Sequence, residues 1–193
     1  EAAEVSLAPL AHRRVAVIGY GTMGRAHALN LRDAGVAVVV GARDGSARGA
    51  LARREGLPVS GVAEAVAQAD VVMHMLPDEA MGAVHRDAIA PHLKPGAALG
   101  FAHGFAIAFG QISPAPGTPC FLVAPKAQGD LLREAFAAGR GAPGLLAVTD
   151  DSPGGTWALA AAYARAVGCL GGGGWRTTRS EEHTSELQSP VVI

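Results

Sequence analysis

One histidine and one lysine follow apolar runs of strand length, and both are candidates for chemistry. His103 comes just after Ala97–Phe101, and Lys126 comes just after Cys120–Ala124. Histidine is the side chain best suited to move protons near neutral pH, and a lysine ammonium can steady an anionic substrate or a metal-bound oxygen. Ligands of open α/β sheets bind at the carboxyl ends of strands. We therefore predict catalytic roles for His103 and Lys126; the alternatives are a structural histidine and a solvated surface lysine.

A glycine-rich turn near the start of the chain predicts a site for phosphate groups. The apolar run Val15–Ile18 leads directly into this turn and then into a helix-like segment. The residues of the turn are Gly19, Tyr20, Gly21, Thr22, Met23 and Gly24. In such a turn the first glycine allows a sharp bend, the second lets the backbone approach a pyrophosphate, and the third lets the helix pack closely on the strand. Amides at the helix N-terminus then face the phosphates. We predict a dinucleotide site, against a plain structural turn.

The segment after Ala37–Gly41 predicts which dinucleotide is bound. An NAD site places a carboxylate here for the ribose 2′-hydroxyl, whereas an NADP site places a cation and hydroxyl donors for the 2′-phosphate. Arg43 and Ser46 fit NADP, with Arg48 as extra charge. Asp44 is the competing candidate for NAD, but Asp-Gly is also a common turn pair. We therefore favour NADP.

A Leu-Pro-Asp-Glu segment ends another apolar run, Val71–Leu76. Its proline ends the strand, and Asp78 can cap the helix that follows. The same carboxylate lies at a strand end, where ligands bind, so direct contact with the coenzyme is equally open, and both roles can hold at once. Within the run, His74 is expected to be a hydrogen-bonded core residue.

These candidates depend on strand-like runs that alternate with helix-like segments from Val15 onward. Such alternation predicts an α/β fold of the Rossmann type, with a doubly wound, mainly parallel sheet and helices on both faces. The predicted strands are Val15–Gly19, Ala37–Gly41, Val71–Leu76, Ala97–Phe101, Cys120–Ala124 and Leu145–Val148. The predicted helices lie near 24–34, 46–55, 62–69, 79–90, 130–138 and 154–167, and the glycine run 171–174 ends the pattern.

The composition narrows the class of protein. The 193 residues are 49% hydrophobic, which is enough for one sizeable core. A formal net charge of −1 without a Lys/Arg cluster predicts no binding to nucleic acid or to an anionic membrane surface. The cysteines, Cys120 and Cys169, lack Cys-x-x-Cys spacing. This pattern predicts buried thiols in a reducing cytoplasm and no metal site of this chain's own.

Taken together, the motifs resemble the N-terminal NADP-binding domain of the ketol-acid reductoisomerase family, the acetohydroxy acid isomeroreductases, in its short-chain class. The resemblance runs from about Ser6 to Thr178. It rests on GYGTMGRAHALNLRDAG, VVVGARDGS, VVMHMLPDE, LKPGAALGFAHGF, FGQI, VAPKAQG and GAPGLLAV, in matching order and spacing. It implies a Mg²⁺-dependent alkyl migration in 2-acetolactate or 2-aceto-2-hydroxybutyrate. Hydride transfer from NADPH then gives a 2,3-dihydroxy acid in valine and isoleucine biosynthesis.

The resemblance also implies a role for each matching residue. His103 would be the catalytic histidine, and Lys126 matches a lysine near the reacting oxygens. The implied coenzyme contacts are Tyr20 to Met23 under the pyrophosphate, Arg43, Ser46 and Arg48 at the 2′-phosphate, Asp78, Glu79, Ala80 and Met81 along the coenzyme, and Gly129. The parent protein would act on a small-molecule substrate and assemble as a homo-oligomer.

The chain departs from the family pattern at several positions. Thr22-Met23 stands where the family usually has Ser-Gln, Arg48 stands where it usually has serine, and His74 replaces an aliphatic residue. These changes affect the expected affinity for the coenzyme rather than its class.

Residues 179–193 are polar, lack a helical or strand period and resemble a translated sequencing adapter. We therefore expect an NADP-binding domain over 1–178 and a disordered, non-native tail over 179–193. The family's Mg²⁺ ligands are acidic residues of a C-terminal helical domain, and Glu181, Glu182 and Glu186 are not expected to replace them. This half alone is expected to bind NADPH with little or no turnover.

Two other functions stay open at this point. One is a stand-alone NADP-binding or sensing module without catalysis. The other is an NADP-dependent dehydrogenase of the β-hydroxyacid type, from which the Phe-Ala-His-Gly-Phe segment at 101–105 distinguishes the chain.

Overall fold

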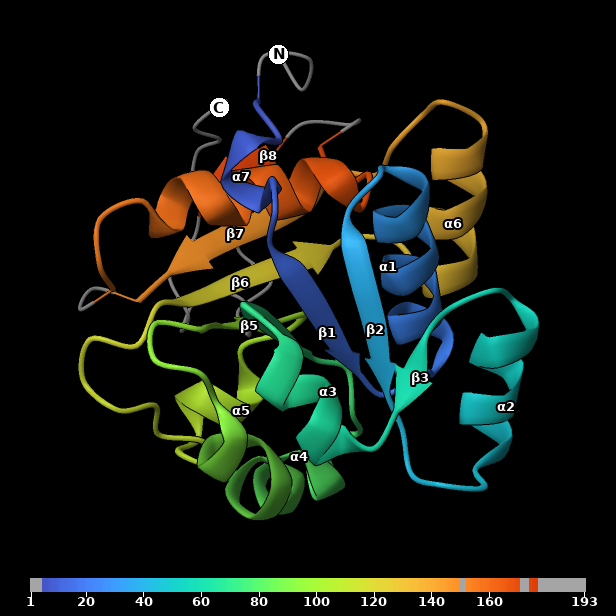
Figure 1. Ribbon diagram of the computed structural model, residues 1–193. Coiled ribbons are helices and arrows are strands. Elements are labelled where there is room, and N and C mark those ends of the chain that lie inside the picture. The colour runs from blue at the N-terminus through green and yellow to red at the C-terminus, as the bar shows by residue number, and fades with distance from the viewer. Residues whose placement is uncertain (1–4, 150–151, 171–173, 177–193) are drawn as a thin grey trace.

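The structure is a computed structural model that describes residues 5–149, 152–170 and 174–176. Over these residues the strands join in one sheet, in the order β3-β2-β1-β4-β5-β6-β7-β8 (Figure 1). The strands are β1 (Arg14–Ile18), β2 (Ala37–Gly41), β3 (Val59–Ser60), β4 (Val71–His74), β5 (Ala98–Phe101), β6 (Cys120–Pro125), β7 (Gly144–Val148) and β8 (Gly174–Arg176). Neighbouring strands run parallel except β6 and β7. The predicted α/β class with a doubly wound, mainly parallel sheet is confirmed.

Helices cover both faces of this sheet (Figure 1). The α-helices are α1 (Thr22–Asp33), α2 (Ala47–Arg54), α3 (Val62–Gln68), α4 (Asp78–Val84), α5 (Phe105–Ala108), α6 (Gly129–Ala137) and α7 (Thr156–Ala166). Helices α1 and α7 pack on one face, with α6 against α1, and α3, α4 and α5 pack on the other. In β1, Val15 and Val17 join the core of the first face, whereas Ala16 and Ile18 join that of the second. Because both faces are buried, β1 shows in the sequence as a continuous apolar run.

One predicted helix is divided in the structure. The segment predicted at 79–90 is helix α4, then a π-helical turn η2 (His85–Ile89), and then a 3₁₀ turn η3 (Ala90–His92). Pro91 lies in the last turn, and because proline has no amide hydrogen the α-helical ladder cannot continue through it.

Four short elements were not predicted. They are a 3₁₀ turn η1 (Ala8–Leu10), strand β3, helix α5 and strand β8. Each has two to four residues, which is too short for a period in the sequence to show. The other predicted elements are present, with ends that differ by a few residues.

The edge that matters for ligands is the one at which β1, β2, β4, β5 and β6 end. These strands share one direction. The strand order reverses between β1 and β4, and a doubly wound sheet binds ligands at such a point. The predicted site residues follow these strands in the chain, so the fold brings them to one edge.

Cys120 and Cys169 are buried thiols, as predicted, and they form no disulfide. Among the described helices, none has the length and apolar character needed to cross a membrane. The predicted tail at 179–193, with Glu181, Glu182 and Glu186, lies outside the described residues, as does the predicted domain end at 178.

Candidate functional site

The glycine turn connects β1 to α1 at the ligand edge of the sheet. Gly19 has a φ of +102°, and a Cβ built on it would lie 2.5 Å from the carbonyl oxygen of Met75. A Cβ on Gly24 would lie 2.4 Å from the carbonyl oxygen of Gly19. Only glycine fits such contacts, so the first glycine makes the bend and the third lets α1 pack closely on the strand.

The middle glycine of the turn faces open space. Gly21 is the N-cap of α1, and a Cβ built on it meets no atom within 4 Å. Its φ of −72° is accessible to any residue, so neither strain nor crowding within the chain requires glycine here. The predicted close approach of a pyrophosphate to this backbone is compatible with the open space. The first amides of α1, which have no partner within the helix, are the donors that an anion would meet.

The start of α6 lies against the back of this turn. A Cβ on Gly129 would lie 2.3 Å from the carbonyl oxygen of Thr22 and 2.7 Å from the amide nitrogen of Met23. Packing on the backbone of the turn therefore accounts for glycine at this position. The coenzyme contact of Gly129 stays a prediction, and its place beside the turn is compatible with it.

The side chain of Tyr20 is turned into the protein. It is 2% exposed, and its hydroxyl donates a hydrogen bond of 2.7 Å to Oε2 of Glu55. Burial, together with the Glu55 carboxylate, raises the pKa of Tyr20, so the hydroxyl remains a neutral donor. Only the backbone of Tyr20 is left to face a coenzyme.

The loop between β2 and α2 carries the residues predicted for the 2′-phosphate. Ser46 is the N-cap of α2, and its Oγ accepts a hydrogen bond of 3.1 Å from the amide of Gly49. The hydroxyl hydrogen of Ser46 can still be donated to another group. Arg43 and Arg48 are exposed, and so is Asp44. The loop and the first turn of α2 together therefore offer two cations and a hydroxyl donor beside one competing carboxylate.

The structure brings Asp78 and His103 together. Nε2 of His103 lies 3.3 Å from Oδ1 of Asp78, and the two side chains are 40% and 42% exposed. The predicted capping role of Asp78 is wrong, because α4 begins at Asp78 itself, its N-cap is Pro77, and no side chain caps the helix. Oδ1 of Asp78 is buried and has no aligned hydrogen-bond partner among the described residues. An imidazole N–H at Nε2 of His103 is thus close enough to donate a hydrogen bond to Oδ1 of Asp78 after a small reorientation.

The remaining predicted residues differ in how much of each side chain is exposed. Lys126 is exposed just after β6, and its amide donates to the carbonyl oxygen of Pro143 at 2.8 Å. In α4, Glu79 is exposed and Ala80 is partly exposed. Met81 is 1% exposed and belongs to the core, so its side chain is not available at the surface of this structure.

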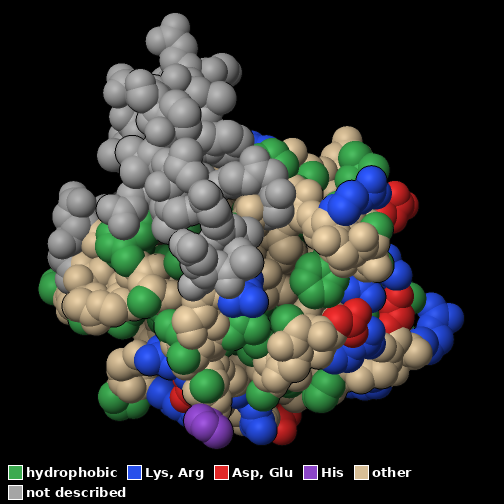
Figure 2. Space-filling view, turned by 90° about the horizontal axis from the view of Figure 1, so that it is seen from above, with side chains coloured by type: hydrophobic (Ala, Val, Ile, Leu, Met, Phe, Trp, Pro, Cys, Tyr) green, Lys and Arg blue, Asp and Glu red, His purple; other side chains and the backbone are tan. Residues whose placement is uncertain are grey.

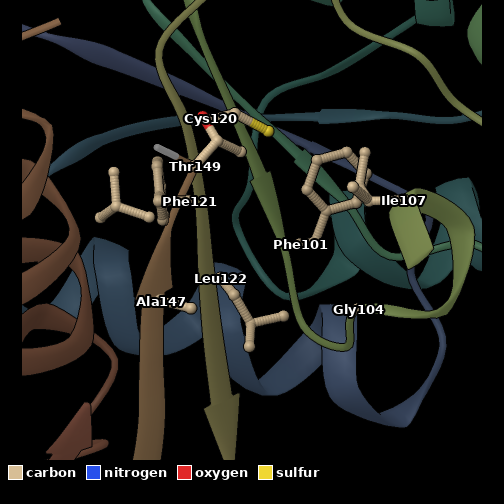
Figure 3. A pocket seen from close by; sticks show the side chains of 9 residues that line it. Phe101, Gly104, Ile107, Cys120, Phe121, Leu122, Ala147 and Thr149 are labelled. Carbon is tan, nitrogen blue, oxygen red and sulfur yellow. The ribbon is translucent and has the colours of Figure 1, made fainter. Parts of the chain in front are cut away.

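A small apolar pocket lies between α5 and the strands β5, β6 and β7 (Figure 3), and its lining includes Gly104, the residue after His103. Its lining residues are Phe101, Gly104, Ile107, Cys120, Phe121, Leu122, Ala147, Val148 and Thr149. None of them is a predicted site residue, and none carries a charge at neutral pH. The lining of this pocket therefore supplies no charged group for the candidate chemistry.

His74 is confirmed as a hydrogen-bonded core residue. Its Nδ1 lies 3.2 Å from the carbonyl oxygen of Gly100, and its Nε2 lies 3.0 Å from Nδ1 of His85. A carbonyl only accepts, so Nδ1 of His74 carries the hydrogen and His85 donates to Nε2. Burial, with a smaller effect of His85, lowers the pKa of His74 to about 3.

Glu55 and His85 were missed by the sequence analysis. Glu55 binds Tyr20 from 35 residues away, and His85 meets His74 only because the chain turns back through α4. No local spacing signals either contact, so these partners become visible only in the folded chain.

Comparison with known proteins decides the family. A family model described as "Acetohydroxy acid isomeroreductase, NADPH-binding domain" matches residues 9–173. The chain belongs to this family. Ketol-acid reductoisomerase (NADP(+)) 2 of Bifidobacterium longum (strain NCC 2705) is 50% identical over 175 residues, which cover 91% of this chain and 50% of that protein.

A second relative gives the same result for the isomeroreductase family. Ketol-acid reductoisomerase (NADP(+)) of Bifidobacterium animalis subsp. lactis (strain AD011) is 49% identical over 181 residues, which cover 94% of this chain and 52% of that protein. The chain thus spans about half the length of the curated relatives it matches.

Solved structures agree with this family. An NADH-preferring ketol-acid reductoisomerase from an uncultured archean matches with a TM-score of 0.89 and 36% identity, over 93% of this chain and 56% of that chain. A semialdehyde dehydrogenase NAD-binding protein from Cupriavidus necator, at 23% identity and a TM-score of 0.70, covers 88% of this chain and 64% of that chain and shows the shared fold alone. Because an isomeroreductase that prefers NADH has the same fold, the coenzyme preference depends on local residues.

Proposed function

We propose that this chain is the coenzyme-binding half of a ketol-acid reductoisomerase and that it binds NADPH in preference to NADH. The observation that carries the proposal is the open space in front of Gly21, in a turn whose other glycines are tightly packed. A pyrophosphate is the group that a glycine backbone and helix amides bind in such a turn. Membership of the isomeroreductase family supports the same coenzyme class.

The preference for NADPH is assigned to the loop after β2. The guanidinium of Arg43 and the hydroxyl of Ser46 bind the 2′-phosphate, and Arg48 adds charge, because a phosphate dianion prefers cationic and hydroxyl donors. Asp44 is the residue that would instead favour NADH. Arg43 in the loop and Arg48 in the first turn of α2 are both exposed and together outnumber this carboxylate, which favours the phosphorylated coenzyme.

The parent protein is proposed to convert 2-acetolactate or 2-aceto-2-hydroxybutyrate into 2,3-dihydroxy acids in valine and isoleucine biosynthesis. Bound NADPH supplies the hydride. His103 exchanges a proton with a substrate oxygen, and Asp78 orients the imidazole. The ammonium of Lys126 steadies the anionic substrate.

The Mg²⁺ ion that the resemblance implies does not fit the described residues. Over those residues, no group of three His, Cys, Asp or Glu side chains is placed to hold a metal ion. We propose that its ligands belong to the other half of the parent protein, so this chain alone turns over little or no substrate. The parent is further proposed to be a homo-oligomer that works in the cytoplasm, without a nucleic-acid or membrane partner.

Calorimetric titration of the purified chain with NADPH and with NADH tests the coenzyme assignment. We expect NADPH to bind more tightly, and we expect Arg43→Ala to weaken NADPH binding about tenfold while leaving NADH binding unchanged. Arg53→Ala is the matched control, because Arg53 is an exposed arginine in the last turn of α2, at the end of that helix away from the loop that holds Arg43. Equal affinity of the unaltered chain for both coenzymes would refute the assignment.

A further inference from the structure

A cluster of polar side chains joins the glycine turn to the far end of α2. The members of this Glu55 cluster are Tyr20, Arg25, Arg32 and Glu55. Tyr20 belongs to the glycine turn, both arginines belong to α1, and Glu55 is the C-cap of α2. Figure 2 shows basic and acidic side chains gathered on the side of the molecule where α1, α2 and α6 lie. Ion pairs from Arg25 to Glu55 and to Asp130, and from Arg133 to Asp33, connect α1 with α2 and α6, so the cluster is part of a series of charged contacts between these helices.

Glu55 is the acceptor at the centre of the cluster. The hydroxyl of Tyr20 donates to it at 2.7 Å, and Nε and Nη2 of Arg25 donate to its carboxylate at 2.5 to 3.0 Å. Arg32 donates to its backbone carbonyl oxygen at 2.6 Å. The hydrogen bond from Arg25 lowers the pKa of Glu55, so the carboxylate stays charged. A bidentate pair of this kind, with the carboxylate 21% exposed, is stronger than an ordinary surface ion pair.

Helix α2 has a small apolar contact with the core. Its fully buried residues are Gly49 and Ala52, Leu51 is partly buried against the core, and the helix packs against β2 and the two-residue strand β3. Burial of two small residues and part of a leucine is a weak constraint on the orientation of a helix. The tie from Glu55 to α1 and the glycine turn therefore adds to that constraint.

The opposite end of α2 holds the groups assigned to the 2′-phosphate. Ser46 is its N-cap, and Arg48 lies in its first turn. The backbone hydrogen bonds of an eight-residue α-helix join its two ends, so we expect a change at Glu55 to shift Ser46 and Arg48 relative to the glycine turn.

We propose that Glu55 is a positioning residue that determines coenzyme specificity. By tying the last turn of α2 to α1 and to the glycine turn, it holds the first turn of α2 at the correct distance from the bound pyrophosphate. Glu55 touches no coenzyme atom and acts through Ser46 and Arg48. The inference rests on the proposed function, because it takes the 2′-phosphate to bind at the start of α2.

The decisive variant is Glu55→Gln, titrated with NADPH and with NADH by calorimetry. We expect about a tenfold loss of NADPH affinity, because the first turn of α2 is no longer held against the phosphate, and no comparable loss for NADH. Tyr20→Phe removes the hydroxyl that joins the glycine turn to Glu55. The glycine turn is proposed to bind the pyrophosphate, which NADPH and NADH share. Tyr20→Phe should therefore weaken NADPH and NADH by the same factor.

Asp70→Asn is the matched control for loss of a carboxylate. Asp70 accepts a hydrogen bond of 2.8 Å from the amide of Arg14 and pairs with Lys94 at 3.2 Å, and it contacts no member of the Glu55 cluster. We expect it to lower the melting temperature as Glu55→Gln does, but to leave the ratio of NADPH to NADH affinity unchanged. If Glu55→Gln does not fold, Glu55→Asp keeps the charge on a shorter side chain and should reduce the same ratio.

The outcomes separate this inference from the proposed function. A chain that prefers NADPH and loses that preference in the Glu55 variant supports the inference. A chain that prefers NADPH equally with and without the Glu55 carboxylate overturns the inference and leaves the proposed function standing. An unaltered chain that binds both coenzymes equally overturns the proposed function, and the inference falls with it.

Discussion

The three glycines of the glycine turn differ in how much space surrounds them. Gly19 and Gly24 are enclosed by backbone atoms, whereas Gly21 is open. A methyl group at position 21 would meet nothing in the chain, but it would occupy the space in which we place the pyrophosphate. Substitution at these positions therefore separates binding from stability.

We predict that Gly21→Ala changes the free energy of unfolding by less than about 0.5 kcal/mol and weakens NADPH and NADH at least about tenfold. Gly24→Ala should instead lower the free energy of unfolding by about 1 to 3 kcal/mol, because its methyl group would overlap the carbonyl oxygen of Gly19. Urea denaturation and coenzyme titration of both variants measure these effects. Unchanged affinity in Gly21→Ala would remove the pyrophosphate from this place.

The chemistry of the site residues was predictable from the sequence only in part. His103 and Lys126 could be placed at strand ends because the apolar runs before them are unmistakable. The partner of His103 could not, because Asp78 follows β4 and His103 follows β5, and the apolar runs do not show that these two strands are neighbours in the sheet. The local pattern suggested that Asp78 caps a helix, whereas in the structure its side chain lies beside His103 and caps no helix.

Buried histidines connect elements of the fold and make its stability depend on pH. His27 in α1 lies 2.9 Å from the hydroxyl of Tyr163 in α7, and His74 in β4 is bonded to His85 in η2. Burial lowers the pKa of both His27 and His74 to about 3, from an ordinary value of 6.5. Between these values the unfolded chain binds more protons than the folded chain, so stability falls as the pH falls below 6.5.

Each buried histidine should contribute about 1.4 kcal/mol per pH unit to this loss well below pH 6.5. Urea denaturation at a series of pH values measures it. His27→Gln should make the dependence shallower by about one proton, because the variant has one fewer buried imidazole that must be protonated on unfolding. A dependence that is equally steep in His27→Gln would contradict the burial of a neutral imidazole.

The elements themselves were predictable where they are long and buried. The strands of the centre of the sheet show as apolar runs because helices cover both of their faces. Strand β3 and helix α5 are held by their neighbours rather than by their own sequence, and β7 runs antiparallel to β6. Strand direction is not encoded in an apolar run, which is why this reversal was not foreseen.

At the scale of the whole molecule, the fold brings three features to one edge of the sheet. They are the glycine turn, the loop after β2 with Arg43 and Ser46, and the pair of Asp78 and His103. The family is settled by a match over residues 9–173. The division of labour is proposed: this half binds the coenzyme, and the remaining half of the parent supplies the metal ligands. We further propose that Glu55 connects the proposed pyrophosphate site at the glycine turn with the proposed 2′-phosphate site at the start of α2, through its hydrogen bonds to Tyr20 and Arg25.

A crystal structure of the chain with NADP⁺ tests the central claim most directly. We predict the pyrophosphate against the backbone of Gly21 and the first turn of α1, with the 2′-phosphate between Arg43, Ser46 and Arg48. A coenzyme bound elsewhere, or a 2′-phosphate that points into solvent away from this loop, would contradict the account.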